Sequence, residues 1–515
     1  MQAVFEWRAL APVLLILIAA ILGILVEAVV PRVHRYFAQV FLTVGSIIAA
    51  AVFLVANWRR GIGGPAAMGS MMLDRPTYFI WGALLVFGLL AILVFAERQL
   101  NGGVSTFAAS AATVPGSKAE ADASAARLEH TEVFPLALFA LGGMMVFPAA
   151  ADLITLFVAL EVFSLPLYLL CGMARRRRLL SQEAALKYFL LGAFSSAFFL
   201  FGVALLYGFA GSFNLSAIAT AVANPTMGYG ILVAGMAMLG VGLLFKVGLV
   251  PFHNWTPDVY MGAPTPVTGF MAICTKLAAI GATLRVFYVA LSGERWSWQP
   301  LLAVLIVLTM VVGAVWGLTQ NDIKRTLAYS SIAHAGFIMC AVVGASTGTP
   351  TSPLDSVGSA MFYLVVYGLA SVGAFAVVTL VRTPAGEANS INSWSGLARK
   401  SPLLAGVFAL FMLSFAGIPL TGGFIGKWAV FAAAWRGGYD WLVIVAVLLS
   451  LVAAVFYLRI IVVMFFGDPA DGVEVGKASA FTWLPILVSA LGVAVLGVFP
   501  GPILDLATAA STFLR

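Results

Sequence analysis

The chain has 515 residues, of which 62% are hydrophobic and 10% charged, and its mean hydropathy is +1.04. Since a soluble protein of this length carries about a quarter charged residues, the composition excludes a soluble protein and predicts an all-α polytopic protein in a lipid bilayer. The net charge is +7, which fits lysine and arginine retained in cytoplasmic loops. The sequence contains no basic patch interleaved with aromatic residues, which argues against a nucleic-acid partner.

Apolar runs long enough to cross a hydrocarbon core of about 30 Å predict 14 spans. The first three lie at 9–30, 37–56 and 77–96 and form an N-terminal unit over 1–97. The segment 98–130 is rich in Ala and Ser and lacks apolar periodicity, so it is expected to be a flexible cytoplasmic loop. The next ten spans lie at 131–148, 152–173, 183–210, 227–250, 264–291, 300–319, 323–345, 357–381, 402–435 and 439–466. The last span, 480–503, belongs to a C-terminal loop and span over 467–515.

Two of these spans are irregular. The run 402–435 would be about 50 Å long as one helix, and its motif GIPLTGGFIGKW places Pro419 among glycines, which should break it. The span 227–250 leads into Pro251 and is expected to break there. Two interrupted helices in matching positions of two halves indicate an inverted-repeat transporter. The sequence therefore predicts two inverted five-helix repeats, spans 4–8 (131–291) and spans 9–13 (300–466), each with its fourth helix broken.

Counting Lys and Arg in the loops predicts the orientation. If the N-terminus lies outside, the inward loops hold 15 of these residues and the outward loops and tails hold 7, which favours both termini on the outer side. The outward group is Arg8, Arg59, Arg60, Arg75, Arg295, Arg436 and Arg515. The RRRR run at 175–178 lies in an inward loop and is interpreted as a topology anchor rather than a docking site.

Each ionisable residue inside a span requires a structural or functional explanation, because inserting such a side chain at the bilayer centre costs about 2.5–3.5 kcal/mol on insertion scales. Four of them lie near span ends and are assigned to snorkelling: Glu27, Asp152, Arg285 and Arg459. The central candidates for a functional site are Glu161, Lys187, Lys246, Lys276 and Lys427, accompanied by His253 and His334.

Several of these candidates keep a structural alternative. Glu161 could instead form an ion pair that locks two helices together. Lys187 follows Glu183 by four residues, the favoured order for a helical pair, so it has either a pairing or a transport role. His253 and His334 could bridge the lysines through water, because imidazole both accepts and donates a proton, or each could be a buried hydrogen-bonding group.

The lysines themselves favour a proton relay. A lysine removed from water gives up its proton far more readily than an arginine, which stays charged and holds carboxylates in two-point contact. Lys246 and Lys276 are therefore suited to a site that loads and releases protons, and Lys427 repeats the arrangement beside the second predicted break.

Ligands for a cofactor are missing from the sequence. The three cysteines, Cys171, Cys274 and Cys340, are far apart, and there is no CxxC, CxxCH or Cys/His cluster. No Walker loop and no GxGxxG followed by an acidic residue is evident. The sequence predicts no cofactor, metal or redox centre in this chain.

The charged residues lie in motifs that resemble the antiporter-like membrane subunits of proton-pumping NADH:quinone oxidoreductase (respiratory complex I), a family of proton-conducting membrane transporters. The motifs are ALEVFSLPLYLL with Glu161, EAALKYFLLGAFSSAFFLFG with Lys187, FKVGLVPFHNWTPDVYMGAPTPVTGF with Lys246 and His253, DIKRTLAYSSIAHAGF with His334, and FAGIPLTGGFIGKW with Lys427. The resemblance covers about 131–466. Within the family the chain is most similar to N-type members, because L-type members typically continue into a lateral helix and M-type members typically carry glutamate where Lys427 stands. The segment 98–131 departs from shorter members.

The resemblance implies that the chain is a subunit of a proton-translocating enzyme (a translocase of the EC 7.1.1 type), driven by redox chemistry in other subunits. Glu161 would modulate the charge of Lys246, Lys246 with Lys276 and His253 would form the central relay, and Lys427 would be the terminal donor or acceptor. Quinone, NADH, FMN and iron–sulfur clusters are expected in partner subunits. The expected partners are an M-type subunit and small A-, J- and K-type subunits, in the inner (plasma) membrane of a bacterium.

Two other functions stay open. A subunit of a multi-subunit sodium/proton antiporter belongs to the same superfamily, although nothing in the sequence clearly marks a sodium cage of clustered carboxylates and carbonyls. A non-conducting scaffold would use the buried charges only to pair helices.

Overall fold

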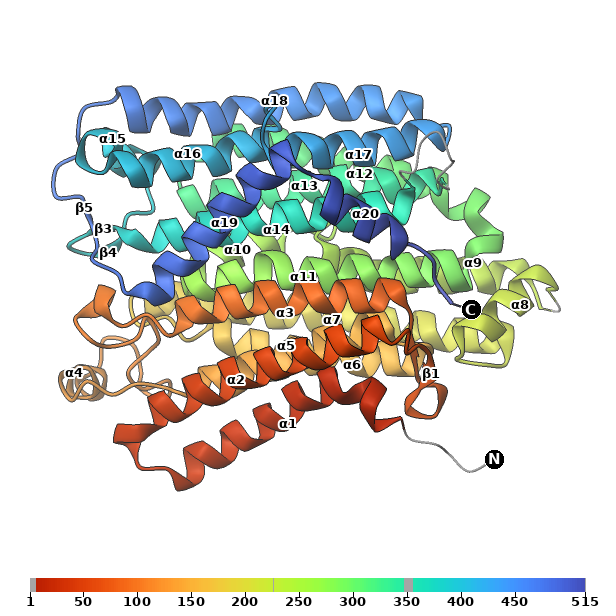
Figure 1. Cartoon of the computed structure of the whole chain (residues 1–515), viewed down its shortest axis with the longest axis horizontal. Coiled ribbons are helices and arrows are strands. Elements are labelled where there is room, and N and C mark those ends of the chain that lie inside the picture. Colours follow the sequence, from red (N-terminus) through yellow and green to blue (C-terminus); the bar gives the residue numbers. More distant parts are fainter. Residues whose placement is uncertain (1–5, 226, 347–354, 515) are drawn as a thin grey trace.

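The computed structural model describes residues 6–225, 227–346 and 355–514, so Arg515, counted above among the outward cations, lies outside the described residues. The long helices run roughly side by side, and both ends of the described chain lie at the same end of the bundle (Figure 1). Twelve helices of the described chain are long and apolar enough to cross a membrane, and Val133–Ala149 and Pro402–Ala416 are shorter apolar helices. The predicted all-α polytopic fold is confirmed, and the two shorter helices lie at the remaining two predicted segments, 131–148 and 402–435.

The N-terminal unit consists of three helices and a hairpin that joins the second helix to the third. They are α1 (Trp7–Val29), α2 (Arg32–Arg59), β1 (Gly64–Ala66), β2 (Met71–Leu73) and α3 (Arg75–Phe95). The hairpin strands are antiparallel, with Gly64 opposite Leu73. Asp74 ends the hairpin and caps α3, because its carboxylate accepts the N–H of Thr77.

The segment 98–130 is packed against the end of the bundle and contains α4 (Lys118–Ala125). Arg98 pairs with Glu129 at 2.5 Å, and Arg178 at the start of α7 pairs with Glu120 at 2.9 Å. The backbone N–H of Gly116 and the Arg178 guanidinium hold the pKa of the Glu120 carboxyl below its usual range. The first ion pair thus closes the predicted loop on itself, and the second ties it to the helical body at the start of α7 (Arg178–Ala210).

The two five-span units follow one another along the chain. The first contains α5 (Val133–Ala149), α6 (Leu153–Cys171), α7 (Arg178–Ala210), α8 (Leu215–Ala223), α9 (Tyr229–Val247), α10 (Trp255–Gly262) and α11 (Thr265–Arg285). The second contains α12 (Arg295–Thr319), α13 (Ile323–Gly344), α14 (Ser356–Leu380), β3 (Val381–Thr383), β4 (Gly386–Glu387), α15 (Leu397–Lys400), α16 (Pro402–Ala416), α17 (Gly422–Arg436) and α18 (Asp440–Phe466). After them come β5 (Glu474–Val475), which pairs with β3, then α19 (Ala480–Val498) and α20 (Gly501–Ala509). Because each unit has five spans, the second unit starts at the opposite end of the bundle from the first.

The fourth span is broken in both units, as predicted. The run 402–435 divides into α16 and α17 at Gly417, and the span 227–250 contains α9, after which the chain leads through the break into α10. The first break lies earlier than predicted: α9 ends at Val247, four residues before Pro251, because Gly248 adopts a left-handed conformation with φ +85°.

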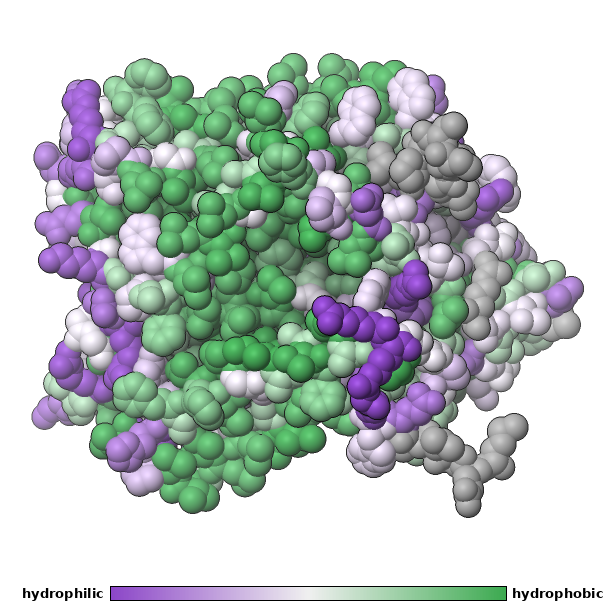
Figure 2. All heavy atoms as spheres, in the orientation of Figure 1, coloured by the Kyte–Doolittle hydropathy of each residue, from purple (hydrophilic) through white to green (hydrophobic). Residues whose placement is uncertain are grey.

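The centre of the bundle is formed by α11 and α13, whose most apolar 18-residue stretches are wholly buried. Here α11 packs on α14, and α10 packs on α13, so the two units meet along these helices. The outer face seen in Figure 2 is mainly apolar between hydrophilic residues that gather toward the two ends of the helices. This arrangement places polar intramembrane groups of α11 and α13 away from lipid.

Arg285 corrects one sequence-based assignment. It was expected to snorkel to the membrane surface, but it is 2% exposed and its guanidinium binds the Asp74 carboxylate at 2.7 Å. The same guanidinium donates to Thr77 and to the carbonyl of Pro148. The charge is thus accommodated by pairing inside the protein, and it fastens α11 to the N-terminal unit.

Candidate functional site

The two helix breaks have the same local geometry. In each, a glycine in the left-handed region (Gly248 with φ +85°, Gly417 with φ +79°) follows the last helical residue. The N–H groups of Gly248 and the next residue both bond to the carbonyl of Leu244, and those at the second break both bond to Leu413. A proline follows each glycine within three residues and prevents the helix from resuming at once.

Each break presents a backbone carbonyl to a buried lysine. The Lys276 amine on α11 donates to the carbonyl of Val247, the last residue of α9, at 2.8 Å. The Lys427 amine on α17 donates to the carbonyl of Ala416, the last residue of α16, at 2.9 Å. Both lysines are buried, with 3% and 6% of their surface exposed. The ends of the broken helices carry negative partial charge, so each holds a cation without a carboxylate.

Lys246 lies one residue before the end of α9 in an aromatic cage. Its amine is 5.1 Å from the ring centroid of Tyr188 and 5.2 Å from that of Phe163, and Tyr168 and Phe245 complete the cage at 5.6 Å. The residue is 2% exposed, and its amine makes no hydrogen bond within the described chain. The four rings therefore supply cation–π contacts in place of hydrogen bonds.

Glu161 on α6 is the carboxylate assigned to the same region. It is partly buried and accepts a hydrogen bond from the Ser196 hydroxyl on α7 at 2.5 Å. Its charge acts on Lys246, yet no ion pair within 4 Å joins them in the part of the chain that the structure describes. Glu161 and Lys246 are thus coupled through space without a direct contact.

His334 on α13 lies inside the second unit. Its Nδ1 lies 2.7 Å from the Tyr363 hydroxyl and its Nε2 lies 3.2 Å from the Tyr457 hydroxyl. The charges of Lys276 and Lys427 both act on this 1% exposed ring. His334 therefore connects, electrostatically, the lysine at one break with the lysine at the other.

Two predicted site residues lie apart from this group. Lys187 is 43% exposed and pairs with Glu183 at 2.7 Å and with Asp258 at 2.8 Å. Asp258 on α10 also pairs with Arg325 of α13, so the lysine belongs to a network between α7, α10 and α13. His253 lies partly buried in the segment between α9 and α10, and no hydrogen bond of the described chain joins it to a lysine.

The structure adds groups that the sequence analysis missed. The Ser450 hydroxyl on α18 accepts a hydrogen bond from the Lys427 amine at 2.6 Å. The hydroxyls of Tyr363 and Tyr457 are hydrogen-bond partners of His334. A lone serine or tyrosine inside an apolar run is the only sequence signal for such residues, because a polar group in a span needs a partner. The hydroxyls of Tyr188 and Thr256, beside Lys246 and Gly248, make no hydrogen bond within the described chain.

No group of three His, Cys, Asp or Glu side chains in the described residues is arranged to hold a metal ion. The three cysteines are buried and do not form a disulfide. The ionisable groups of the site are amines, an imidazole and a carboxylate, which are groups that can accept and donate protons.

The chain is similar to known proteins in both sequence and fold. Residues 150–453 match the family described as NADH:quinone oxidoreductase/Mrp antiporter, TM. The chain is 54% identical to the NADH-quinone oxidoreductase subunit N of a Nocardioides species, over 99% of this chain and 98% of the relative. Respiratory complex I from Thermus thermophilus contains a chain that is 31% identical, with a TM-score of 0.77 over 96% of this chain and 99% of that one. A chain of the Mrp complex from a Dietzia species shares the fold, with a TM-score of 0.80 at 21% identity over 98% of this chain and 97% of that one.

Proposed function

Because the chain belongs to the family of NADH-quinone oxidoreductase subunit N, and is thus a membrane-arm subunit of that complex, we propose how it moves protons. Protons pass along Glu161, Lys246, Lys276, His334 and Lys427. The electrons that drive this movement are handled in other subunits. This chain holds no redox centre, and the complex as a whole is a translocase.

One observation carries the proposal: a lysine amine binds the freed carbonyl at each helix break, and His334 lies within Coulombic range of both amines. A carbonyl has no proton to give, so an amine bound to it can lose or gain a proton without breaking an ion pair. A shift of charge at one lysine changes the energy of the proton on His334 and on the next lysine. Because of this coupling, the loss of a proton from one residue of the relay favours protonation of the next residue.

Lys246 is the lysine of the relay whose amine needs water as its hydrogen-bond partner. Its amine, the Tyr188 hydroxyl and the Thr256 hydroxyl lack protein partners in the described chain, and buried polar groups of this kind are where ordered water binds. Water would then connect Lys246 with Lys276 past Gly248, where an added Cβ would meet the Thr256 hydroxyl and the Lys276 amine. His253 and Lys187 have peripheral roles, at the exit from the break and in the ion-pair network with Asp258.

The surroundings of the chain complete the proposal. It lies in the inner membrane of a bacterium with both termini on the outer side. Its neighbours are an M-type subunit and the small A-, J- and K-type subunits. Quinone, NADH, FMN and iron–sulfur clusters bind to other subunits of the complex.

The test measures NADH-driven proton uptake by inverted membrane vesicles that contain the assembled complex. Lys276→Met and Lys427→Met should each abolish most uptake, while Lys187→Met, the matched control on a half-exposed lysine, should retain it. Uptake by the unaltered complex should not require sodium. Full uptake in both buried-lysine variants would support a scaffold instead, and sodium-driven proton flux without NADH would support a sodium/proton antiporter.

A further inference from the structure

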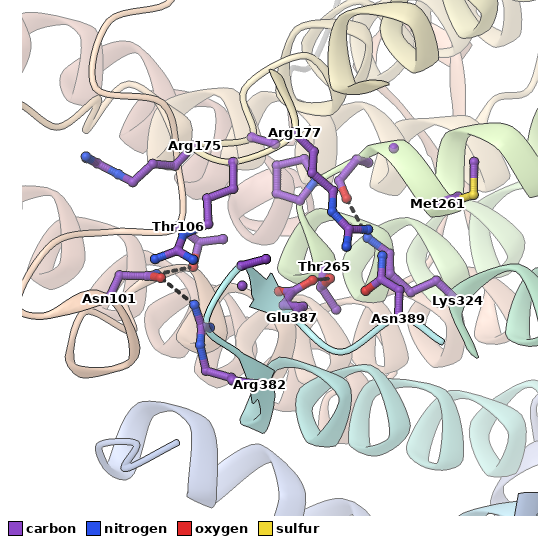
Figure 3. Close-up of a pocket in the computed structure, with 17 residues that line it drawn as sticks. Asn101, Thr106, Arg175, Arg177, Met261, Thr265, Lys324, Arg382, Glu387 and Asn389 are labelled. Atoms are coloured by element: carbon purple, nitrogen blue, oxygen red, sulfur yellow. Dashed lines mark hydrogen bonds between the residues drawn. The ribbon is translucent and has the colours of Figure 1, made fainter. Parts of the chain in front are cut away.

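Two sequence features that proton movement leaves unexplained meet in one pocket. The arginine run at 175–177 and the segment 98–130 line a cavity of about 60 Å³ together with the β3–β4 hairpin and the start of α11 (Figure 3). A single water needs roughly 10–15 Å³ of such volume. The cavity therefore has room for a small ion or a head group.

The pocket contains five cationic side chains and one carboxylate. The cations are Arg175, Arg176, Arg177, Lys324 and Arg382, and the carboxylate is Glu387. Glu387 accepts a hydrogen bond from Thr265, and it forms no ion pair within 4 Å in the described part of the chain. Most of the positive charge in this pocket is not neutralised by the protein.

The partners of these cations are neutral. Arg175 donates to the carbonyls of Ser105 and Phe107 at 2.9 Å, Lys324 donates to the carbonyl of Ala263 at 2.7 Å, and Arg382 donates to the Asn101 side chain at 2.8 Å. The carbonyl of Arg177 accepts the N–H of Ser181, but its guanidinium makes no hydrogen bond or ion pair among the described residues. These contacts orient the side chains and leave the charge itself available.

Like charges also face one another across the cavity. Glu387 attracts both Lys324, which is 2% exposed, and Arg382, and Asp322 also attracts Lys324. Arg177 repels Lys324 and Arg176 repels Arg382, each to a smaller extent. A buried charge is costly unless an opposite charge accompanies it, and Coulombic repulsion between two cations adds to that cost. The first residue of α11, Thr265, lines the same cavity, so the positive end of a 21-residue helix adds to the field.

We propose that this pocket binds a phosphate-bearing anion. Guanidinium groups match phosphate oxygens in paired hydrogen bonds, and a phosphate between Arg177, Lys324 and Arg382 would remove the repulsion. The phosphate could come from the head group of an anionic phospholipid at the membrane surface or from free phosphate in solution. The segment 98–130 then acts as one wall of the site.

The test uses the whole complex purified in detergent, unaltered or with Arg177→Gln or Arg382→Gln. The Arg177 side chain is exposed and unpartnered, so its replacement should not disturb folding. Arg60→Gln is the matched control, because Arg60 is an exposed arginine between α2 and β1, and β1 lies at the opposite end of the bundle from β3 and β4 (Figure 1). In one arm, inorganic phosphate is titrated against sodium chloride at equal ionic strength and the thermal midpoint is recorded. In the other, nanodiscs of phosphatidylcholine with or without phosphatidylglycerol are compared, and bound lipid is counted by native mass spectrometry.

Saturable binding in either arm supports the site, provided that Arg177→Gln and Arg382→Gln weaken it about tenfold or more while Arg60→Gln does not. Binding in the phosphate arm identifies a free anion, and binding in the nanodisc arm identifies a lipid head group. The proposal is overturned if neither arm gives binding that depends on the two arginines. It is equally overturned if a carboxylate of another subunit is found in the pocket.

Discussion

The two glycines at the helix breaks offer a matched pair of substitutions. Gly248→Ala and Gly417→Ala both place a side chain in the left-handed region, at φ +85° and +79°, which costs about 1–2 kcal/mol each. They differ in what the new methyl group meets. At Gly417 it would lie 2.8 Å from the Lys427 Cδ and 3.2 Å from the amine, whereas at Gly248 its nearest neighbours are the Thr256 hydroxyl at 3.4 Å and the Lys276 amine at 3.7 Å.

The methyl group at 417 must push the Lys427 side chain away, because 2.8 Å is closer than carbon atoms approach. The amine should then lose its bond to the Ala416 carbonyl, a contact to a charged group worth about 1.5–3 kcal/mol. The methyl group at 248 fits at ordinary contact distance and leaves the Lys276 amine in place. Both variants should therefore lower the thermal midpoint of the purified complex, and Gly417→Ala should lower it more.

Proton movement should separate the two variants further. Proton uptake per NADH oxidised, measured in inverted vesicles, should fall severalfold in Gly417→Ala and stay near the unaltered value in Gly248→Ala. The content of assembled complex in the membranes is the control for both. Equal losses of uptake in the two variants would show that backbone strain, and not the position of the lysine amine, is responsible.

Three further substitutions separate relay contacts from structural ones. Ser450→Ala removes one of the two hydrogen bonds of the Lys427 amine, so proton uptake should fall in part while assembly is retained, as blue native gels can show. Arg285→Met leaves the buried Asp74 carboxylate unpaired, which should cost about 3–5 kcal/mol and reduce the amount of assembled complex; rescue by the second change Asp74→Asn would confirm the cause. Lys187→Met breaks half-exposed ion pairs worth at most about 1 kcal/mol each, so the thermal midpoint and the uptake should both change little.

The broken helices could be predicted because their causes are local. A glycine next to a proline stops a helix whatever surrounds it, and both breaks lie within a few residues of their expected positions. The buried lysines could be predicted for a similar reason, since a charge inside an apolar run is costly enough to require a function or a partner.

The partners of these charges could not be predicted. Arg285 is 211 positions from Asp74, and a hydropathy pattern contains no information about which helices pack together. For the same reason no sequence pattern indicated that Lys427 would bind Ser450, or that His334 would lie between two tyrosines. The segment 98–130 lacks periodicity because its contacts are ion pairs and loop hydrogen bonds to the bundle end, which leave no regular pattern.

Lys246 provides the most direct test of proton movement through the buried lysines. Its amine makes no hydrogen bond in the described chain and contacts only aromatic rings, so Lys246→Met removes the proton site and keeps an apolar side chain of similar length. The measurement is the number of protons translocated per NADH oxidised by the assembled variant complex in sealed vesicles. We expect this ratio to fall well below that of the unaltered complex, with assembly intact. An unchanged ratio in a fully assembled variant would contradict a proton relay through this lysine.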